Sequence, residues 1–158
     1  MTDHGNMFGA HSFNAQAKKS GIKPIIGIEA YVAPASRYTR KPVFWGERAR
    51  TGKKEVDEYG ESGDVSGAGA YTHMTCSRRT RPAAQPVQTV LARVLQGFFR
   101  KPRMDKELIA EHADGIIATS GCLAGEILTR LRLGQKQEAV QAASDYKDIF
   151  GPDPLLHR

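Results

Sequence analysis

Long hydrophobic runs and cysteines are both scarce in this chain of 158 residues. The longest apolar stretch, residues 25–32, contains a glycine and a glutamate and is far shorter than the roughly 18 apolar residues of a membrane span. No secretory signal pattern opens the chain. Two cysteines are too few for a disulfide framework. A cytoplasmic protein without membrane contact is therefore expected.

Acidic residues are outnumbered by basic ones, and the excess of basic residues is confined to one segment. The chain has 23 Lys and Arg against 17 Asp and Glu, a net charge of +6, and such a charge by itself favours nucleic-acid binding. Seven of the basic side chains, and no acidic one, lie within residues 76–103. Outside this segment 16 basic side chains stand against 17 acidic ones. The basic character therefore belongs to one segment only.

Apolar periodicity predicts helices that alternate with short strands. Helices are expected over 10–20, 87–95, 104–113, from 123 to a stop at Gly134, and over 139–150. Strands are expected over 25–32, 70–75 and 115–119. Residues 46–69, rich in glycine and mixed charge, predict a long polar loop. Strands that alternate with helices are typical of an α/β fold with a parallel sheet.

Four side chains with metal-binding chemistry lie on or next to the predicted strands. His4 lies just before the first helix, Glu29 lies within an apolar strand, and His73 lies in the second strand. Cys122 follows the third strand, where a helix begins. In parallel barrels the loops at the carboxyl ends of the strands converge on one rim. Four potential ligands on one rim predict a metal site, to which Asp3 adds a possible carboxylate.

Each of these residues also fits a purely structural interpretation. Asp3 and His4 fit a surface turn in which the aspartate caps the first helix. Glu29, which is costly to bury alone, fits a salt bridge. His73 fits a hydrogen-bonded core residue, and Cys122 fits an inert buried thiol. Residue types and spacing alone leave both interpretations open.

Several motifs in a fixed order carry a family resemblance. The first are Thr2-Asp-His-Gly-Asn-Met-Phe-Gly9, Gly21-Ile-Lys-Pro-Ile-Ile-Gly-Ile-Glu-Ala-Tyr-Val32 and Tyr71-Thr-His-Met74. The others are Lys101-Pro-Arg-Met-Asp105, Gly115-Ile-Ile-Ala-Thr-Ser-Gly-Cys122 and Gly125-Glu126. Together they cover roughly two-thirds of the chain and closely resemble the N-terminal PHP (polymerase and histidinol phosphatase) domain of bacterial DNA polymerase III alpha subunits.

This resemblance implies a distorted, seven-stranded, TIM-like β/α barrel with a metal cluster at its carboxyl end. It implies that four residues are metal ligands, His4, Glu29, His73 and Cys122, while Asp3 is a ligand or supports one. Related domains with complete metal sites resemble phosphoesterases that hydrolyse the 3′ ends of DNA with zinc or manganese, whereas magnesium serves the separate polymerase site. By family, the protein would be a DNA-directed DNA polymerase in replication, with DNA and other replicase subunits as partners.

The chain departs from the family at both ends and in its middle. The family's His-x-His motif precedes residue 1 and its Asp-x-His motif follows residue 158, so residues 1–150 are expected to form a partial PHP domain without its first strand and C-terminal part. The polymerase carboxylates also lie elsewhere, so no catalytic residue is assigned and the isolated fragment is expected to be inactive. Residues 76–100 keep the family's length but not its pattern, as a reading-frame shift would produce, and 151–158 form a divergent tail.

Two other functions also fit parts of the sequence. A free-standing phosphoesterase of the histidinol-phosphatase kind would share the metal motifs. In its gene, unlike that of a polymerase subunit, the phosphoesterase domain would not be followed by polymerase sequence. A small basic nucleic-acid-binding protein would use residues 78–103, and its DNA binding would depend steeply on salt.

Overall fold

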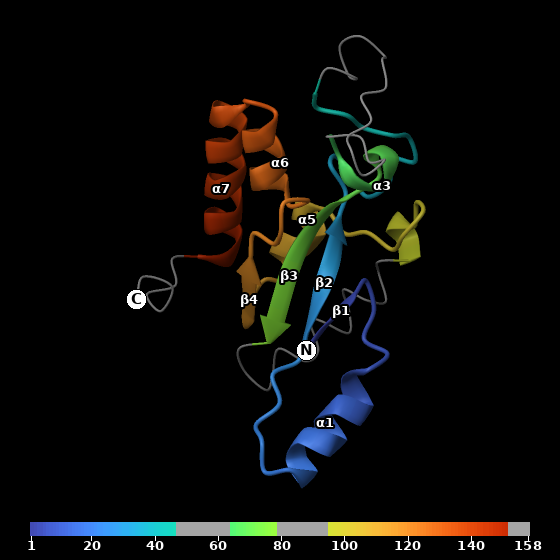
Figure 1. The fold of residues 1–158 in the computed structure, drawn as a ribbon. Coiled ribbons are helices and arrows are strands. Elements are labelled where there is room, and N and C mark those ends of the chain that lie inside the picture. The colour runs from blue at the N-terminus through green and yellow to red at the C-terminus, as the bar shows by residue number, and fades with distance from the viewer. Residues whose placement is uncertain (47–63, 79–94, 152–158) are drawn as a thin grey trace.

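Four strands form one mixed sheet in the computed structural model, which describes residues 1–46, 64–78 and 95–151 (Figure 1). The strands, neighbours in this order, are β1 (Thr2–His4), β2 (Gly27–Val32), β3 (Thr72–Arg78) and β4 (Ile116–Thr119). The helices are α1 (Ala10–Lys19), α3 (Ser66–Gly69), α5 (Lys106–Glu111), α6 (Glu126–Arg132) and α7 (Lys136–Phe150), with a 3₁₀ turn η1 (Leu95–Gly97). No helix in the described ranges is long and apolar enough to cross a membrane.

The strand pairing corrects the expected parallel sheet. β1 and β2, which are connected through α1, pair in parallel. β2–β3 and β3–β4 are antiparallel, so the prediction is wrong for two of the three pairings. β3 begins at the end of the sheet where β2 finishes, so the two strands run in opposite directions. The spacing of apolar residues predicts a strand but does not predict its direction. Within the described ranges the sheet is open, and a closed barrel is not formed.

Most of the predicted elements are confirmed with shifted ends. α1, α5 and α7 lie within or close to the predicted ranges, and β2 begins at Gly27, two residues later than expected. β3 runs on to Arg78, so the first residues of the segment predicted to be aberrant belong to the sheet. Residues 2–4, expected to be part of a turn, form β1. The predicted helix over 87–95 and most of the predicted 46–69 loop lie outside the described residues.

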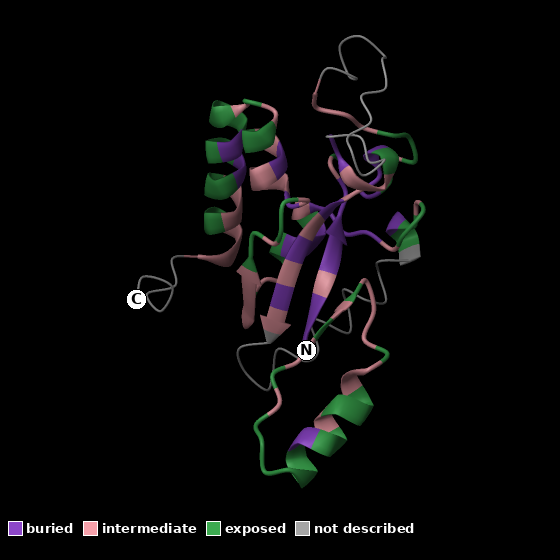
Figure 2. Ribbon diagram, viewed as in Figure 1, coloured by how far each residue is buried: buried purple, intermediate pink, exposed green. Residues whose placement is uncertain are grey.

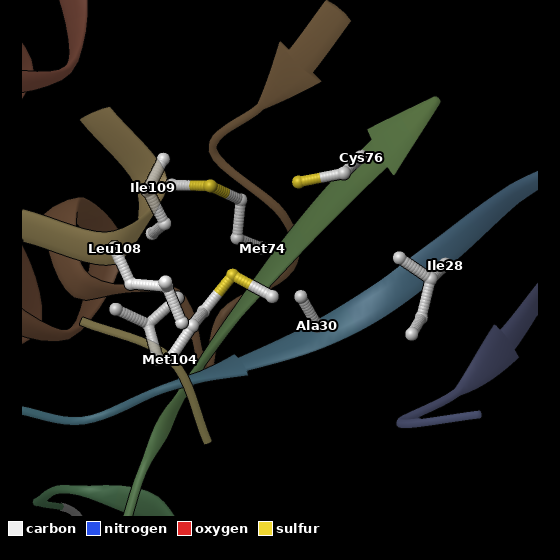
Figure 3. Close-up of a cluster of buried hydrophobic side chains, with 8 residues drawn as sticks. Ile28, Ala30, Met74, Cys76, Met104, Leu108 and Ile109 are labelled. Carbon is white, nitrogen blue, oxygen red and sulfur yellow. The ribbon is translucent and has the colours of Figure 1, made fainter. Parts of the chain in front are cut away.

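The hydrophobic core fills one face of this sheet. Alternate side chains of β2 and β3 turn to that face and meet α5 and Met104, which lies two residues before that helix. The buried cluster consists of Ile28, Ala30, Val32, Met74, Cys76, Met104, Leu108 and Ile109 (Figure 3). Figure 2 shows the buried residues concentrated on β2 and β3, while the outer side of α7 is exposed. Burial raises the pKa of the Cys76 thiol to about 12, so this cysteine is an unreactive core residue.

A buried ion pair connects the loop after β2 to the start of α5. The Asp105 carboxylate accepts hydrogen bonds from the backbone N–H and the guanidinium of Arg37, at 2.8 and 2.6 Å. It also accepts one from the backbone N–H of Leu108 at 3.1 Å and so caps α5. Burial would raise the pKa of Asp105, but these hydrogen bonds and the charge of Arg37 outweigh burial and hold that pKa below its ordinary value.

We expect Asp105→Asn to lower the free energy of unfolding by about 2–3 kcal/mol at pH 7, because Arg37 loses its buried charge partner. A carboxyl with a depressed pKa stabilises the folded state above its unfolded pKa of about 3.9, and that stabilisation is lost as the pH falls through the folded value. Urea unfolding at pH 7 and at pH 3 should therefore give a smaller gap between the two proteins at pH 3. A gap of equal size at both pH values would contradict the expectation.

Arg103 is the second buried arginine, and it ties three segments together. Only 1% of its surface is exposed. Its guanidinium donates to the carbonyl oxygens of Gly97 (3.0 Å), Ala70 (2.8 Å), Arg37 (3.1 Å) and Thr39 (2.9 Å). Ala70 lies two residues before β3, so this cluster of hydrogen bonds helps fix where β3 begins.

Candidate metal centre

The candidate ligands lie on the face of the sheet opposite the core. Side chains alternate along a strand, so Glu29 in β2 and His73 in β3 turn away from the buried cluster. His4 ends β1 directly opposite Glu29 and shares that face. Cys122 lies three residues after β4, at the end of the sheet where β3 begins. The antiparallel pairing therefore still gathers the ligands, because β3 starts where the other strands finish.

Glu29 lies at the centre of the cluster. Its Oε1 is 2.5 Å from His73 Nδ1, and its Oε2 is 3.3 Å from His4 Nδ1. Cys122 Sγ is 4.0 Å from the same His73 nitrogen. One ligand atom from each of Glu29, His73 and Cys122 lies within 4.8 Å of the others. The structure thus brings together four of the five residues singled out in the sequence.

The cluster is reached from the surface. The side chains of Glu29 and His73 keep 18% and 17% of their exposure, whereas the His4 side chain keeps 70% and Cys122 is exposed. Two imidazoles contact the Glu29 carboxylate and offset the cost of its partial burial. The inner pair, Glu29 and His73, is therefore held in place, while His4 and Cys122 lie open to a solute.

Two tyrosines that the sequence analysis missed form a wall beside His73. The ring centroids of Tyr31 and Tyr71 are 4.4 Å apart and lie 5.5 and 5.6 Å from that of His73. Burial, helped by Tyr71 and Glu29, raises the pKa of Tyr31, so its phenol stays neutral. The signal was present in the sequence: Tyr31 lies two residues after Glu29 and Tyr71 two before His73, which is the spacing of one strand face.

Gly5, the residue after His4, allows the Tyr31 ring to pack directly against the main chain. Its φ is +67°, and an added Cβ would overlap the ring. The Gly5 N–H also donates to the Glu29 carbonyl at 2.9 Å. The residue after His4 is thus held against β2 by a backbone hydrogen bond and by the ring that covers it.

The turn that carries Cys122 packs directly against the start of β3. The His73 N–H donates to the Ala124 carbonyl at 3.1 Å, and the Gly125 N–H donates to the Cys122 carbonyl at 2.8 Å. An added Cβ at Gly125 would overlap the carbonyl oxygen of Ser120. The thiol is therefore positioned by main-chain contacts between two segments that are 49 residues apart.

Asp3 does not join the cluster. It lies opposite Ile28 in the β1–β2 pairing, so its side chain turns to the face opposite to that of His4. Its Oδ2 accepts a hydrogen bond at 2.9 Å from the N–H of Gly9, the residue before α1. In this structure Asp3 fixes the start of α1 against the strand that ends in His4, and its role as a metal ligand or as a support for one stays a prediction.

The donor set suits a divalent metal ion. Zinc takes carboxylate oxygen, imidazole nitrogen and thiolate sulfur, and a sulfur donor argues against magnesium or calcium. The short contact between His73 Nδ1 and Glu29 Oε1 is a hydrogen bond, and a cation held by both atoms would replace the shared proton. The side chains present therefore fit a metal, with Glu29, His73 and Cys122 as the inner donors and His4 beside them.

Comparison with known proteins identifies the family. Residues 1–156 match the PHP domain. The chain belongs to the PHP domain family. This PHP chain is 64% identical over 154 residues to the DNA polymerase III subunit alpha of Saccharopolyspora erythraea, covering 97% of the chain and 13% of that protein. The subunits from Mycobacterium tuberculosis and Thermus aquaticus are 47% and 42% identical, over 97% and 96% of the chain and 12% and 11% of those proteins.

The match confirms the family that the motifs indicated. The PHP chain spans about an eighth of the length of these relatives. All three relatives are DNA polymerase III alpha subunits, so the resemblance to polymerase alpha subunits is confirmed as well.

Proposed function

We propose that this PHP domain is part of a bacterial DNA polymerase III alpha subunit and supplies it with a metal-dependent phosphoesterase site for DNA 3′ ends. The observation that carries the proposal is the convergence of Glu29, His73 and Cys122 within 4.8 Å on one face of the sheet. The polymerase relatives support the setting: DNA replication, with DNA and the other replicase subunits as partners, in the cytoplasm. In this proposal the four strands are part of a distorted β/α barrel, and the ligand face turns to its interior.

The residues of the cluster have separate tasks in the proposed site. Glu29 and His73 hold the ion from the half-buried side, and Cys122 and the exposed His4 hold it from the open side. The Tyr31 and Tyr71 rings keep the His73 imidazole in one orientation, so that Nδ1 faces the other donors. The bound ion would polarise a phosphate oxygen and activate water for hydrolysis. Zinc or manganese is proposed here, and magnesium is assigned to the polymerase site elsewhere in the alpha subunit.

Two observations favour this proposal over its alternatives. The relatives described above are polymerase subunits, which supports the polymerase over a free-standing phosphoesterase of the histidinol-phosphatase kind. A small nucleic-acid-binding protein would need the basic residues of 78–103 at the surface. In the described part of that segment Arg103 is fully buried, however, and the exposed Arg100 already donates to the carbonyl of Gly67 at 3.0 Å.

We expect the 158-residue chain to bind zinc. His73→Ala should weaken the zinc affinity at least about 100-fold, because the loss of a residue that merely supports a metal ligand already lowers metal affinity 10- to 100-fold. Zinc affinity is measured by competition with a chromogenic chelator. His11→Ala, an exposed histidine on α1, is the matched control and should bind zinc as tightly as the unchanged protein. Circular dichroism of each variant checks that the fold is kept. Equal zinc affinity in the two histidine variants would contradict the proposed site.

A further inference from the structure

One lysine lies beside the ligand cluster, in a position that is set by the backbone. Beyond the end of β1, the chain around Met104 takes the place next to β2: Met104 N–H donates to the Tyr31 carbonyl at 2.9 Å and Ala33 N–H to the Met104 carbonyl at 2.7 Å. Three residues earlier, the Lys101 carbonyl accepts from Phe99 N–H at 3.1 Å in a tight turn. These hydrogen bonds fix the main chain of Lys101 near the ligand face.

The Lys101 side chain reaches that face. Its Nζ lies 6.0 Å from the centroid of the Tyr31 ring, within the range of a cation–π contact. His73 is also a neighbour of this ring, with its centroid 5.5 Å away. The ammonium and the inner metal ligand therefore both lie against the same tyrosine ring.

Among the described cations of residues 95–103, Lys101 is the one that is free to bind something else. Arg103 is buried and uses its donors on four carbonyl groups. Arg100 donates to the Gly67 carbonyl. Lys101 is exposed, and no carboxylate in the described parts of the chain forms an ion pair with it. An exposed ammonium without an ion-pair partner in the described residues favours bulk water, so its contact with Tyr31 is what keeps it at the site.

We propose that Lys101 is a substrate-binding residue of the metal site, whose ammonium holds a non-bridging oxygen of the DNA phosphate. The inference rests on the proposed function and adds to it the residue that recognises the anionic substrate. A lysine ammonium binds phosphate as a point charge on a flexible stem, and it can follow the phosphate without displacing the metal ligands. The Tyr31 ring attracts the ammonium and also contacts His73, so one aromatic side chain links the charge to an inner donor of the cluster.

The test is the binding of a single-stranded DNA octamer, labelled at its 5′ end, to the zinc-loaded chain at several salt concentrations. We expect Lys101→Gln to weaken binding about ten-fold, the scale of one charge-assisted hydrogen bond. The slope of log affinity against log salt should become shallower by about 0.7, the loss of one phosphate contact on a single strand. Lys101→Arg should restore both quantities. Lys147→Gln, which removes an exposed lysine on α7, is the matched control and should change neither.

Zinc affinity separates this inference from the proposed function. Lys101→Gln should bind zinc as tightly as the unchanged chain, because Lys101 is not among the donors. Failure of the unchanged chain to bind zinc would overturn the proposed function, and the salt slopes measured in chelator would then still decide about Lys101. Equal DNA affinity and equal slope for Lys101→Gln and Lys147→Gln would overturn the inference and leave the metal site standing.

Discussion

Arg103→Met is expected to lower the free energy of unfolding by about 3–4 kcal/mol, a large share of the stability of a domain of this size. Methionine approximates the length of the arginine stem, so the change removes the guanidinium without opening a large cavity. The carbonyl groups of Gly97, Ala70, Arg37 and Thr39 then lose a buried donor. Each such loss costs up to about 1–3 kcal/mol, and relaxation toward water recovers part of the total.

Denaturant unfolding of the unchanged chain and of Arg103→Met measures this difference in the free energy of unfolding. Arg103→Lys is the control that keeps the charge, and it should recover part of the stability, because an ammonium has three donors where the guanidinium uses four hydrogen bonds. We also expect Arg103→Met to weaken zinc binding, since Ala70 leads into the strand that carries His73. A loss below about 1 kcal/mol would mean that these carbonyls find other donors, and the role assigned to Arg103 would be wrong.

Gly125→Ala is expected to destabilise the chain by about 3 kcal/mol and to weaken zinc binding as well. The new methyl group would overlap the main-chain carbonyl of Ser120, and a backbone atom cannot move aside as the end of a flexible side chain can. Gly125 also closes the turn that carries Cys122, through its N–H bond to the Cys122 carbonyl. Relief of the overlap would therefore shift the thiol relative to His73.

Gly134→Ala is the matched control for this change. Gly134 has a φ of +74° and an added Cβ there meets nothing within 4 Å, so only the backbone conformation is penalised, by about 1–2 kcal/mol. We expect its zinc affinity to be unchanged, because Gly134 lies between α6 and α7 and away from the ligands. Zinc titration of both variants measures the affinities, and denaturant unfolding measures the two losses of stability. Equal losses in the two variants would show that steric overlap at Gly125 is not the cause.

Local patterns in the sequence were enough to locate most of the helices and strands. Helix α1 follows from its apolar spacing and ends at Lys19, two residues before Gly21, and the β-branched run of residues 25–32 contains β2. α5 begins after Asp105 because that side chain caps it. Propensity, capping and periodicity act over a few residues, so they are readable without knowledge of the fold.

Sequence also determined which side chains carry metal-binding chemistry. His4, Glu29, His73 and Cys122 were identified from residue type and from their place on or beside strands, and these four meet around Glu29. The family motifs gave the same residues. A carboxylate in an apolar strand is conspicuous in a sequence because it requires a partner.

Tertiary structure decided what those residues touch. Asp3 and His4 are neighbours in the chain, yet strand alternation sends the carboxylate to α1 and the imidazole to Glu29. The direction of β3 likewise depends on a connection that covers 39 residues, from 33 to 71, and no local pattern encodes it. Strand direction, the burial of Arg103 and the contacts of Tyr31 with His73 and Lys101 all arise between distant segments. Such contacts form only when the whole sheet is assembled, so the sequence specified the chemical groups and the assembled sheet specified their geometry.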